Sequence, residues 1–87
     1  MGNPMGSPKR NSRPLREPLA LQMGKAIREA REERGLAQDE LAHQAGVSRA
    51  YMGHIEQGLY NITLKKLVQV SVPLKTKPSE LLAKIGL

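Results

Sequence analysis

Apolar residues recur every three or four positions along most of this chain, which is the spacing of one face of an α-helix. The first such stretch carries Met23, Ile27 and Ala30. We therefore expect a helix over about residues 21–34. Gly35 follows it, and glycine readily adopts the left-handed conformation that often ends a helix.

Capping and stop residues divide the next stretch into two short helices. A helix over residues 38–45 is stopped by Gly46, and Ser48 is a favourable cap for a third helix that runs to residue 57, before Gly58. The side chains expected to point inward are Leu41, Ala42, Ala45, Tyr51 or Met52, and Ile55. Two short helices joined by a tight turn are thus predicted at the centre of the chain.

Two further helices are predicted after residue 60. Thr63 can cap a fourth helix, which Pro73 should interrupt because proline lacks an amide hydrogen and clashes with the preceding turn. Pro78 suits the first turn of a fifth helix, with Lys77 or Ser79 near its cap. The inward residues are expected to be Leu64, Leu67, Val68 and Val70 in the fourth helix, and Leu81, Leu82 and Ile85 in the fifth. No stretch alternates with the period of a strand, so the expected fold class is all-α.

Residues 1–18 differ from the rest of the chain in composition. They hold four of the six prolines and few side chains suited to a core, so they cannot offset the entropy cost of ordering. We expect a disordered, Pro-rich arm over residues 1–18 and one folded domain over residues 19–87. The basic residues of the arm are Lys9, Arg10, Arg13 and Arg16. They either contact a partner or only keep the chain soluble.

Charge favours a polyanionic partner. The 87 residues carry 14 Lys and Arg against eight Asp and Glu, a formal net charge of +6, which points to nucleic acid first and an acidic membrane surface second. Residues 1–18 carry +3, residues 19–35 carry +1, residues 36–58 carry −2 and residues 59–87 carry +4. Attraction to phosphate must therefore come from the residues on either side of the central helix pair.

Several function classes lack the residues they need. Without cysteine there is no disulfide and no thiolate metal site, and His43 and His54 lie on different predicted helices without a cluster of other ligands. No nucleophile–base pair or phosphate-binding Gly loop indicates an enzyme. No long apolar stretch predicts a membrane span or signal peptide. We expect no metal, no cofactor and no membrane contact, and a location in the cytoplasm, on the nucleoid if the source is bacterial.

The central helix pair carries the candidate function. Gly46 in the turn can adopt a positive φ, which lets the third helix cross the second at a steep angle. A helix presented in this way fits the major groove of B-DNA, where each base pair offers a distinct pattern of donors and acceptors. The pattern therefore predicts a helix-turn-helix that binds double-stranded DNA.

With these residues in place, the chain closely resembles the phage repressor and Cro-like helix-turn-helix family over roughly residues 23–82. The matching positions are Ile-Arg-Glu-Ala-Arg at 27–31, Gly-Leu-Ala-Gln at 35–38, Glu-Leu-Ala at 40–42, Ala-Gly-Val-Ser-Arg at 45–49, Tyr51, Ile55, Glu56, Gly58, Asn61, Thr63, Leu64, Leu67 and Pro-Ser-Glu-Leu-Leu at 78–82. The combination of Tyr51, Asn61, Thr63 and Leu64 is also similar to the controller proteins of restriction-modification systems.

The resemblance implies a compact five-helix domain that forms a homodimer, binds a palindromic operator and regulates transcription. The residues that match base-reading positions are Gln38, Arg49, Ala50, Gly53 and His54, and those that match phosphate-contacting positions are Ser48, Tyr51, Asn61, Lys65 and Lys66. Arg31 and Glu56 match a buried ion pair that joins the first helix to the third. Arg49 is the strongest candidate for specificity, because a guanidinium can bond both O6 and N7 of guanine.

The chain also departs from the family pattern. Ala37 replaces the usual Ser or Thr cap of the second helix, a loss of typically about 1 kcal/mol, and Gly53 in the third helix costs roughly 1 kcal/mol relative to Ala. Gly53 and Ala50 also shorten the reading surface. Gly53, Ala50 and the charge of −2 over residues 36–58 suit a second hypothesis, a protein-interaction module of the same fold, such as an antitoxin or a cofactor-type subunit, that binds DNA weakly.

Overall fold

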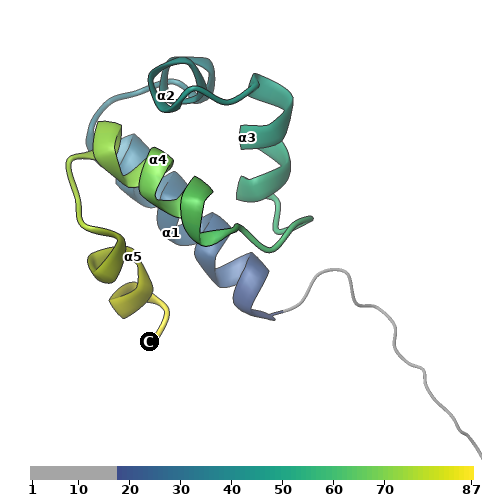
Figure 1. The fold of residues 1–87 in the computed structure, drawn as a ribbon, viewed down its shortest axis with the longest axis vertical. Coiled ribbons are helices and arrows are strands. Elements are labelled where there is room, and N and C mark those ends of the chain that lie inside the picture. Colours follow the sequence, from purple (N-terminus) through teal and green to yellow (C-terminus); the bar gives the residue numbers. More distant parts are fainter. Residues whose placement is uncertain (1–17) are drawn as a thin grey trace, which may run out of the picture.

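The computed structural model describes residues 18–87, and they form five helices, with no strand in that range (Figure 1). The helices are α1 (Pro18–Glu33), α2 (Gln38–Ala45), α3 (Arg49–Glu56), α4 (Leu64–Leu74) and α5 (Pro78–Lys84). The all-α, five-helix prediction is confirmed. The arm predicted over residues 1–18 lies outside the described residues except for Pro18, and so do Lys9, Arg10, Arg13 and Arg16.

α1 is the central helix of the domain. It packs against α3 on one side and α5 on the other, while α2 packs against both α3 and α4. In Figure 1, α2 and α3 lie at one end of the molecule, α5 lies at the opposite end, and α1 and α4 lie between them. The helix-turn-helix pair is therefore held at one end by the longest helix. None of the described helices has the length and apolarity needed to span a bilayer.

Side chains from all five helices form one core. Its fully buried large members are Ile27, Leu41, Met52, Ile55, Val70 and Leu81. Met52 rather than Tyr51 is the inward residue of α3, and Tyr51 packs partly buried against the edge of the core. Removing a core Leu or Ile side chain typically costs about 2–5 kcal/mol in a domain of this kind, so this cluster fixes where α3 sits.

The predicted inward face of α4 is partly wrong. Leu67 and Val70 are buried as expected, but Leu64 and Val68 are exposed, and Ser71 and Leu74 are buried in their place. Because α4 carries apolar residues on more than one side, the spacing alone could not decide which side meets α2 and α5.

Pro73 does not interrupt α4, contrary to the expectation from sequence. The helix continues through Pro73 to Leu74 and ends at Lys75, whose left-handed φ of 56° closes the last turn. Pro73 has no amide hydrogen to donate to the carbonyl of residue 69, so the helix forgoes that one bond and continues for only one residue beyond the proline. The buried Ser71 hydroxyl donates to the carbonyl of Leu67 at 2.6 Å, which satisfies it inside the core.

Two of the predicted helix caps are confirmed. Ser48 Oγ accepts from the amide of Tyr51 at 2.9 Å, and Thr63 Oγ1 accepts from the amide of Lys66 at 3.1 Å. Ala37 provides no side-chain cap for α2, as expected. Its own amide instead donates to Glu40 Oε1 at 2.7 Å, so Glu40 satisfies one backbone donor at the start of α2.

Both α1 and α5 begin at a proline. α1 begins at Pro18, about three residues earlier than expected, because proline fits the first turn of a helix. α5 begins at Pro78 with Lys77 as its cap residue, as predicted. The Lys77 amide donates to Glu80 Oε1 at 2.7 Å. This bond, together with one from the Thr76 hydroxyl, lowers the pKa of Glu80 below its ordinary value.

Candidate nucleic-acid interface

The turn between α2 and α3 consists of residues 46–48. Gly46 has φ 74°, a backbone conformation that side chains with a Cβ resist. The Val47 amide donates to the Ala42 carbonyl at 3.0 Å, which closes the end of α2 before Ser48 starts α3. This local geometry makes a compact helix-turn-helix at one end of the molecule.

The outer side of α3 forms an open, shallow depression with the start of α2. Its lining residues are Gln38, Arg49, Ala50, Gly53, His54 and Gln57. All five predicted base-reading positions therefore lie on one surface. Arg49 and Ala50 are exposed, Gln38 and His54 are half-buried, and Gly53 is buried beneath the others. Gly53 accordingly contributes backbone to the floor of the depression and no contact group of its own.

The predicted phosphate-contacting residues form two groups outside the lining of this depression, and Asn61 lines a separate one with residues of α1. Ser48 and Tyr51 lie on the first turn of α3 or just before it, and Asn61, Lys65 and Lys66 lie at or just before the start of α4. Lys66 Nζ sits 5.8 Å from the centre of the Tyr51 ring, which joins the two groups. Burial raises the pKa of the Tyr51 phenol, so its hydroxyl remains a hydrogen-bond donor at neutral pH.

Tyr60 extends the aromatic surface beside α3 and was not among the predicted site residues. Its ring stacks on Tyr51 with centroids 6.2 Å apart, and His54 meets it edge-on at 5.4 Å. Half of Tyr60 is exposed. In the sequence, only the position of Tyr60 next to the predicted site residue Asn61 pointed to a role. The spacing of residues along the chain did not show that the loop between α3 and α4 folds back onto α3.

A buried ion pair fixes the inner side of α3. Arg31 Nε and Nη2 donate to the two oxygens of Glu56 at 2.7 and 3.0 Å, and Arg31 Nη1 donates to the Leu36 carbonyl at 2.9 Å. The Glu56 side chain is only 3% exposed. Its hydrogen bonds raise the pKa of Arg31, so the guanidinium is charged at every pH at which the domain folds. The structure thus brings Arg31 and Glu56 together in a bidentate ion pair.

Gly24 lets α1 approach α3 more closely than any other residue would, and sequence reasoning missed it. A Cβ placed on Gly24 would collide with the carbonyl oxygen of Ile55 and would lie 2.7 Å from that of Glu56. The last turn of α3 therefore rests directly on the backbone of α1. In the sequence, the only indication of this contact is a glycine within a helical pattern. The contact that requires the glycine joins two helices that are distant in sequence, so the pattern along one helix does not reveal it.

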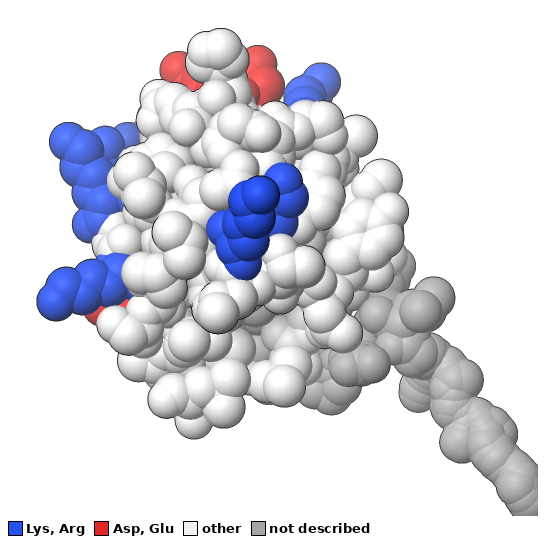
Figure 2. Space-filling view, viewed as in Figure 1, with Lys and Arg blue, Asp and Glu red and all other residues white. Residues whose placement is uncertain are grey.

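The charged surface is uneven. In Figure 2, which has α4 toward the viewer, most of the acidic atoms in view lie at the end where α2 lies, with a basic side chain beside them, and the other basic side chains lie at the centre and along one edge of the face. This matches the charge of −2 over residues 36–58 and of +4 over residues 59–87.

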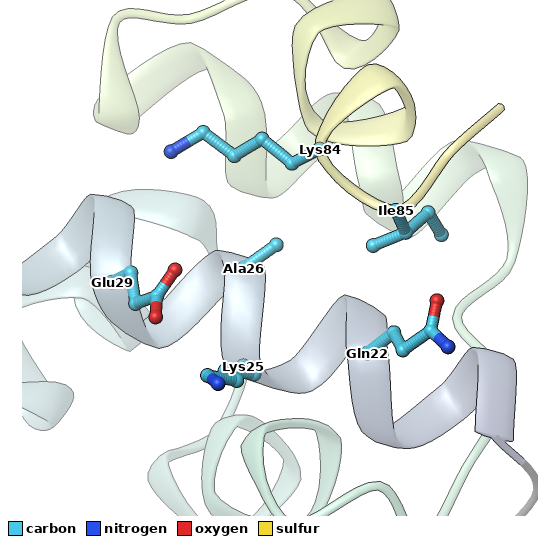
Figure 3. Close-up of a pocket in the computed structure, with 6 residues that line it drawn as sticks. All are labelled: Gln22, Lys25, Ala26, Glu29, Lys84 and Ile85. Carbon is cyan, nitrogen blue, oxygen red and sulfur yellow. The ribbon is translucent and has the colours of Figure 1, made fainter.

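A second depression lies between α1 and α5, away from α3. Figure 3 shows Lys84 of α5 and Ile85, which directly follows that helix, facing Gln22, Ala26 and Glu29 of α1. Its lining provides ammonium and carboxylate groups but no hydroxyl, thiol or imidazole. Within residues 18–87, no three His, Asp or Glu side chains are placed to hold a metal ion.

Comparison with known proteins identifies the family to which this fold belongs. The helix-turn-helix family model matches residues 27–81. Control protein C.SmaI of Serratia marcescens is 34% identical over 61 residues, covering 70% of this chain and 73% of that protein. The crystal structure of the restriction-modification controller protein C.AhdI from Aeromonas hydrophila superposes with a TM-score of 0.73 at 32% identity, covering 75% of this chain and 98% of that one.

A third structure contains DNA. The biofilm master regulator SinR, solved in complex with DNA, is 36% identical with a TM-score of 0.66, covering 69% of this chain and 97% of that one. Two of these three relatives are controller proteins, in agreement with the subgroup that the residues around Tyr51 and Asn61 predicted. The chain belongs to the helix-turn-helix family of DNA-binding transcription regulators.

Proposed function

We propose that this chain regulates transcription as a homodimer that reads a palindromic operator with the outer side of α3. One observation carries the proposal: the five predicted base-reading positions share a single open depression formed by α2 and α3. The ion pair between Arg31 and Glu56 and the close approach at Gly24 hold the opposite side of α3 in place. A rigid helix with a free outer face is what insertion into the major groove requires.

The side chains on that face differ in chemistry. Arg49 presents a guanidinium that can donate two hydrogen bonds to guanine, and the Ala50 methyl group can contact the methyl group of thymine. His54 lies in edge contact with Tyr60, which limits the orientations of its imidazole. We assign base recognition mainly to Arg49 and Gln38 and apolar contact to Ala50, while Gly53 lets the backbone of α3 approach the bases.

We assign phosphate contact to residues outside the lining of the depression. The exposed side chains of Asn61 and Lys65 lie near the start of α4, where free backbone amides also attract anions. Lys66 and the Tyr51 hydroxyl lie on the side of this group nearer α3. The Ser48 hydroxyl caps α3 through its oxygen and keeps its hydrogen available for a phosphate oxygen.

The dimer is proposed from an apolar stripe on α4. Leu64, Val68 and Val72 follow one another at four-residue spacing and are 74%, 46% and 69% exposed. The face in Figure 2 is largely uncharged apart from basic patches. A symmetric pair of such faces buries the stripe, and a palindromic operator would then receive the two α3 helices about 34 Å apart.

Sedimentation tests the dimer. We expect the wild-type chain to sediment as a dimer, and Val72→Glu to shift it toward monomer because a carboxylate would be buried at the interface. Ala83→Glu, at an exposed position on α5, serves as the charge-matched control. A wild-type chain that stays monomeric both alone and on its DNA would refute the dimer.

The basic residues before α1 are proposed to add phosphate contacts. Residues 1–18 carry +3 and include Lys9, Arg10, Arg13 and Arg16, so they could follow the DNA backbone or enter a minor groove. A chain shortened to residues 18–87 should show a flatter dependence of affinity on salt. The log–log slope should fall in magnitude by about 0.9 for each DNA phosphate that these residues neutralise in the full chain. An unchanged slope would reduce this segment to a solubilising tail.

Binding assays with two DNA pools test the function as a whole. Saturable binding that prefers sequences selected from random duplexes over unselected DNA supports the regulator, which would act in the cytoplasm, on the nucleoid of a bacterial cell. Arg49→Ala should weaken binding to the selected DNA far more than Lys84→Ala, which removes the same charge from α5. Uniformly weak binding, with a stable protein complex isolated from cells, would instead support the interaction module.

A further inference from the structure

The amide of Gln38 has a fixed orientation. Gln38 Nε2 donates to Glu56 Oε1 at 3.1 Å. A carboxylate only accepts hydrogen bonds, so the nitrogen end of the amide and not the oxygen end must face Glu56. Gln38 Oε1 and the second N–H of Nε2 are therefore left toward the depression. Within residues 18–87, Oε1 accepts no hydrogen bond from the protein.

Glu56 can hold Gln38 because Glu56 is itself held. Its two oxygens accept from Arg31 at 2.7 and 3.0 Å, in a side chain that is 3% exposed. The Arg31 guanidinium bonds both oxygens of Glu56 at once, which fixes the orientation of that carboxyl group. A chain of hydrogen bonds thus runs from α1 through the buried end of α3 to the first residue of α2.

Gly53 provides the space in which the amide lies. A Cβ at this position would sit 3.5 Å from Gln38 Oε1 and 3.9 Å from its carbonyl carbon. Gln38 therefore lies directly over the backbone of α3, at the level where a larger side chain of α3 would otherwise project. The glycine that shortens the reading surface of α3 allows a residue of α2 to take its place.

We propose that Gln38 reads an adenine in the major groove and that Glu56 is the residue that positions it. Adenine presents N7 as an acceptor beside the N6 amino group as a donor. The free N–H and free Oε1 of Gln38 match that pair in a two-point contact. This inference rests on the proposed function, because it assigns one base of the operator that the domain is proposed to bind.

Selection from a random duplex pool tests the assignment. The wild-type chain should select an A·T pair at one position of each half-site, separate from the guanine assigned to Arg49. Gln38→Met keeps the length of the side chain and should lose that adenine preference alone. Replacing the adenine by 7-deazaadenine, which lacks N7, should weaken wild-type binding by about 5- to 100-fold and leave Gln38→Met binding unchanged.

Glu56→Gln tests the positioning role. The new amide can donate to Gln38 Oε1 and turn the Gln38 amide around, so the adenine preference should fall while the guanine preference stays. Because this variant loses its ion pair, the wild-type chain provides a second measurement by NMR. One of the two side-chain amide protons of Gln38 should be shifted downfield relative to those of the exposed Gln57 in the free protein.

These experiments distinguish a failure of the adenine assignment from a failure of the proposed function. No selected sequence at all would overturn the proposed function and this inference with it. A selected site that is the same for wild type and Gln38→Met would overturn the adenine assignment alone. An unshifted Gln38 amide, or an adenine preference that survives in folded Glu56→Gln, would overturn the role of Glu56.

Discussion

The two sides of α3 are built in opposite ways. On the inner side, Ile55 is buried in the core, Glu56 is fully paired, and the backbone rests on Gly24. On the outer side, Arg49 and Ala50 are exposed along an open depression. One eight-residue helix thus separates two tasks: its inner side determines where the helix lies, and its outer side leaves polar groups free for a partner.

The largest effect on stability is expected at the ion pair. Arg31→Met would remove the bidentate partner of the buried Glu56 carboxylate and leave it only Gln38 and the longer 3.9 Å contact with Arg28 Nε, and breaking such a buried pair typically costs about 3–5 kcal/mol. Urea unfolding at a fixed protein concentration measures this loss. Arg34→Met is the control, because Arg34 is exposed and its change should stay within about 0.5 kcal/mol. A loss below about 1 kcal/mol for Arg31→Met would mean that the inner side does not depend on this pair.

Gly24→Ala should produce the next largest loss. Alanine is favoured over glycine inside a helix by about 1 kcal/mol, but here its Cβ would press against carbonyl oxygens of α3 that cannot move alone. We expect the collision to exceed the gain, for a net destabilisation of about 1–2 kcal/mol, seen as a lower thermal midpoint. A higher midpoint would show that α1 and α3 can separate without cost.

The contact at Gly24 is a feature of the fold that could not be predicted from the sequence. The five helices, the caps at Ser48 and Thr63 and most of the core followed from spacing and from residue types that start or end helices. These signals are local. Gly24 has its reason in the end of α3, about thirty residues away, and a pattern along one helix carries no information about how closely another helix approaches.

The same limit explains the errors in α4 and the gaps in the site. Val68 and Val72 are as apolar as the buried Val70, so only the positions of α2 and α5 decide which of them are covered. Resemblance to a family supplied the site positions on α3. It did not supply the bond from Gln38 to Glu56 or the contact of Tyr60 with Tyr51, because both depend on side-chain conformation in the folded domain.

Gly53→Ala is the outer-side counterpart of Gly24→Ala and should have the opposite sign. A Cβ on Gly53 meets only Gln38, at 3.5 Å, which is an ordinary van der Waals contact. The helix-propensity gain of about 1 kcal/mol is then realised, and the thermal midpoint should rise by about 4–8 °C. If both alanine variants changed stability in the same direction, the contrast between the two sides of α3 would be refuted.

The smallest change in stability is expected at Arg49. Its side chain is exposed on the first turn of α3 and forms no salt bridge within residues 18–87, so Arg49→Ala should alter the free energy of unfolding by less than about 0.5 kcal/mol. DNA binding should respond differently, because a guanidinium that contacts guanine contributes about 1–3 kcal/mol of discrimination. Unfolding curves and titrations of the selected DNA, measured on the same preparation, would show whether the two quantities separate. If Arg49→Ala destabilised the fold as much as Gly24→Ala does, the outer side would share in holding the domain together, and its exposed charge could no longer be assigned to a partner alone.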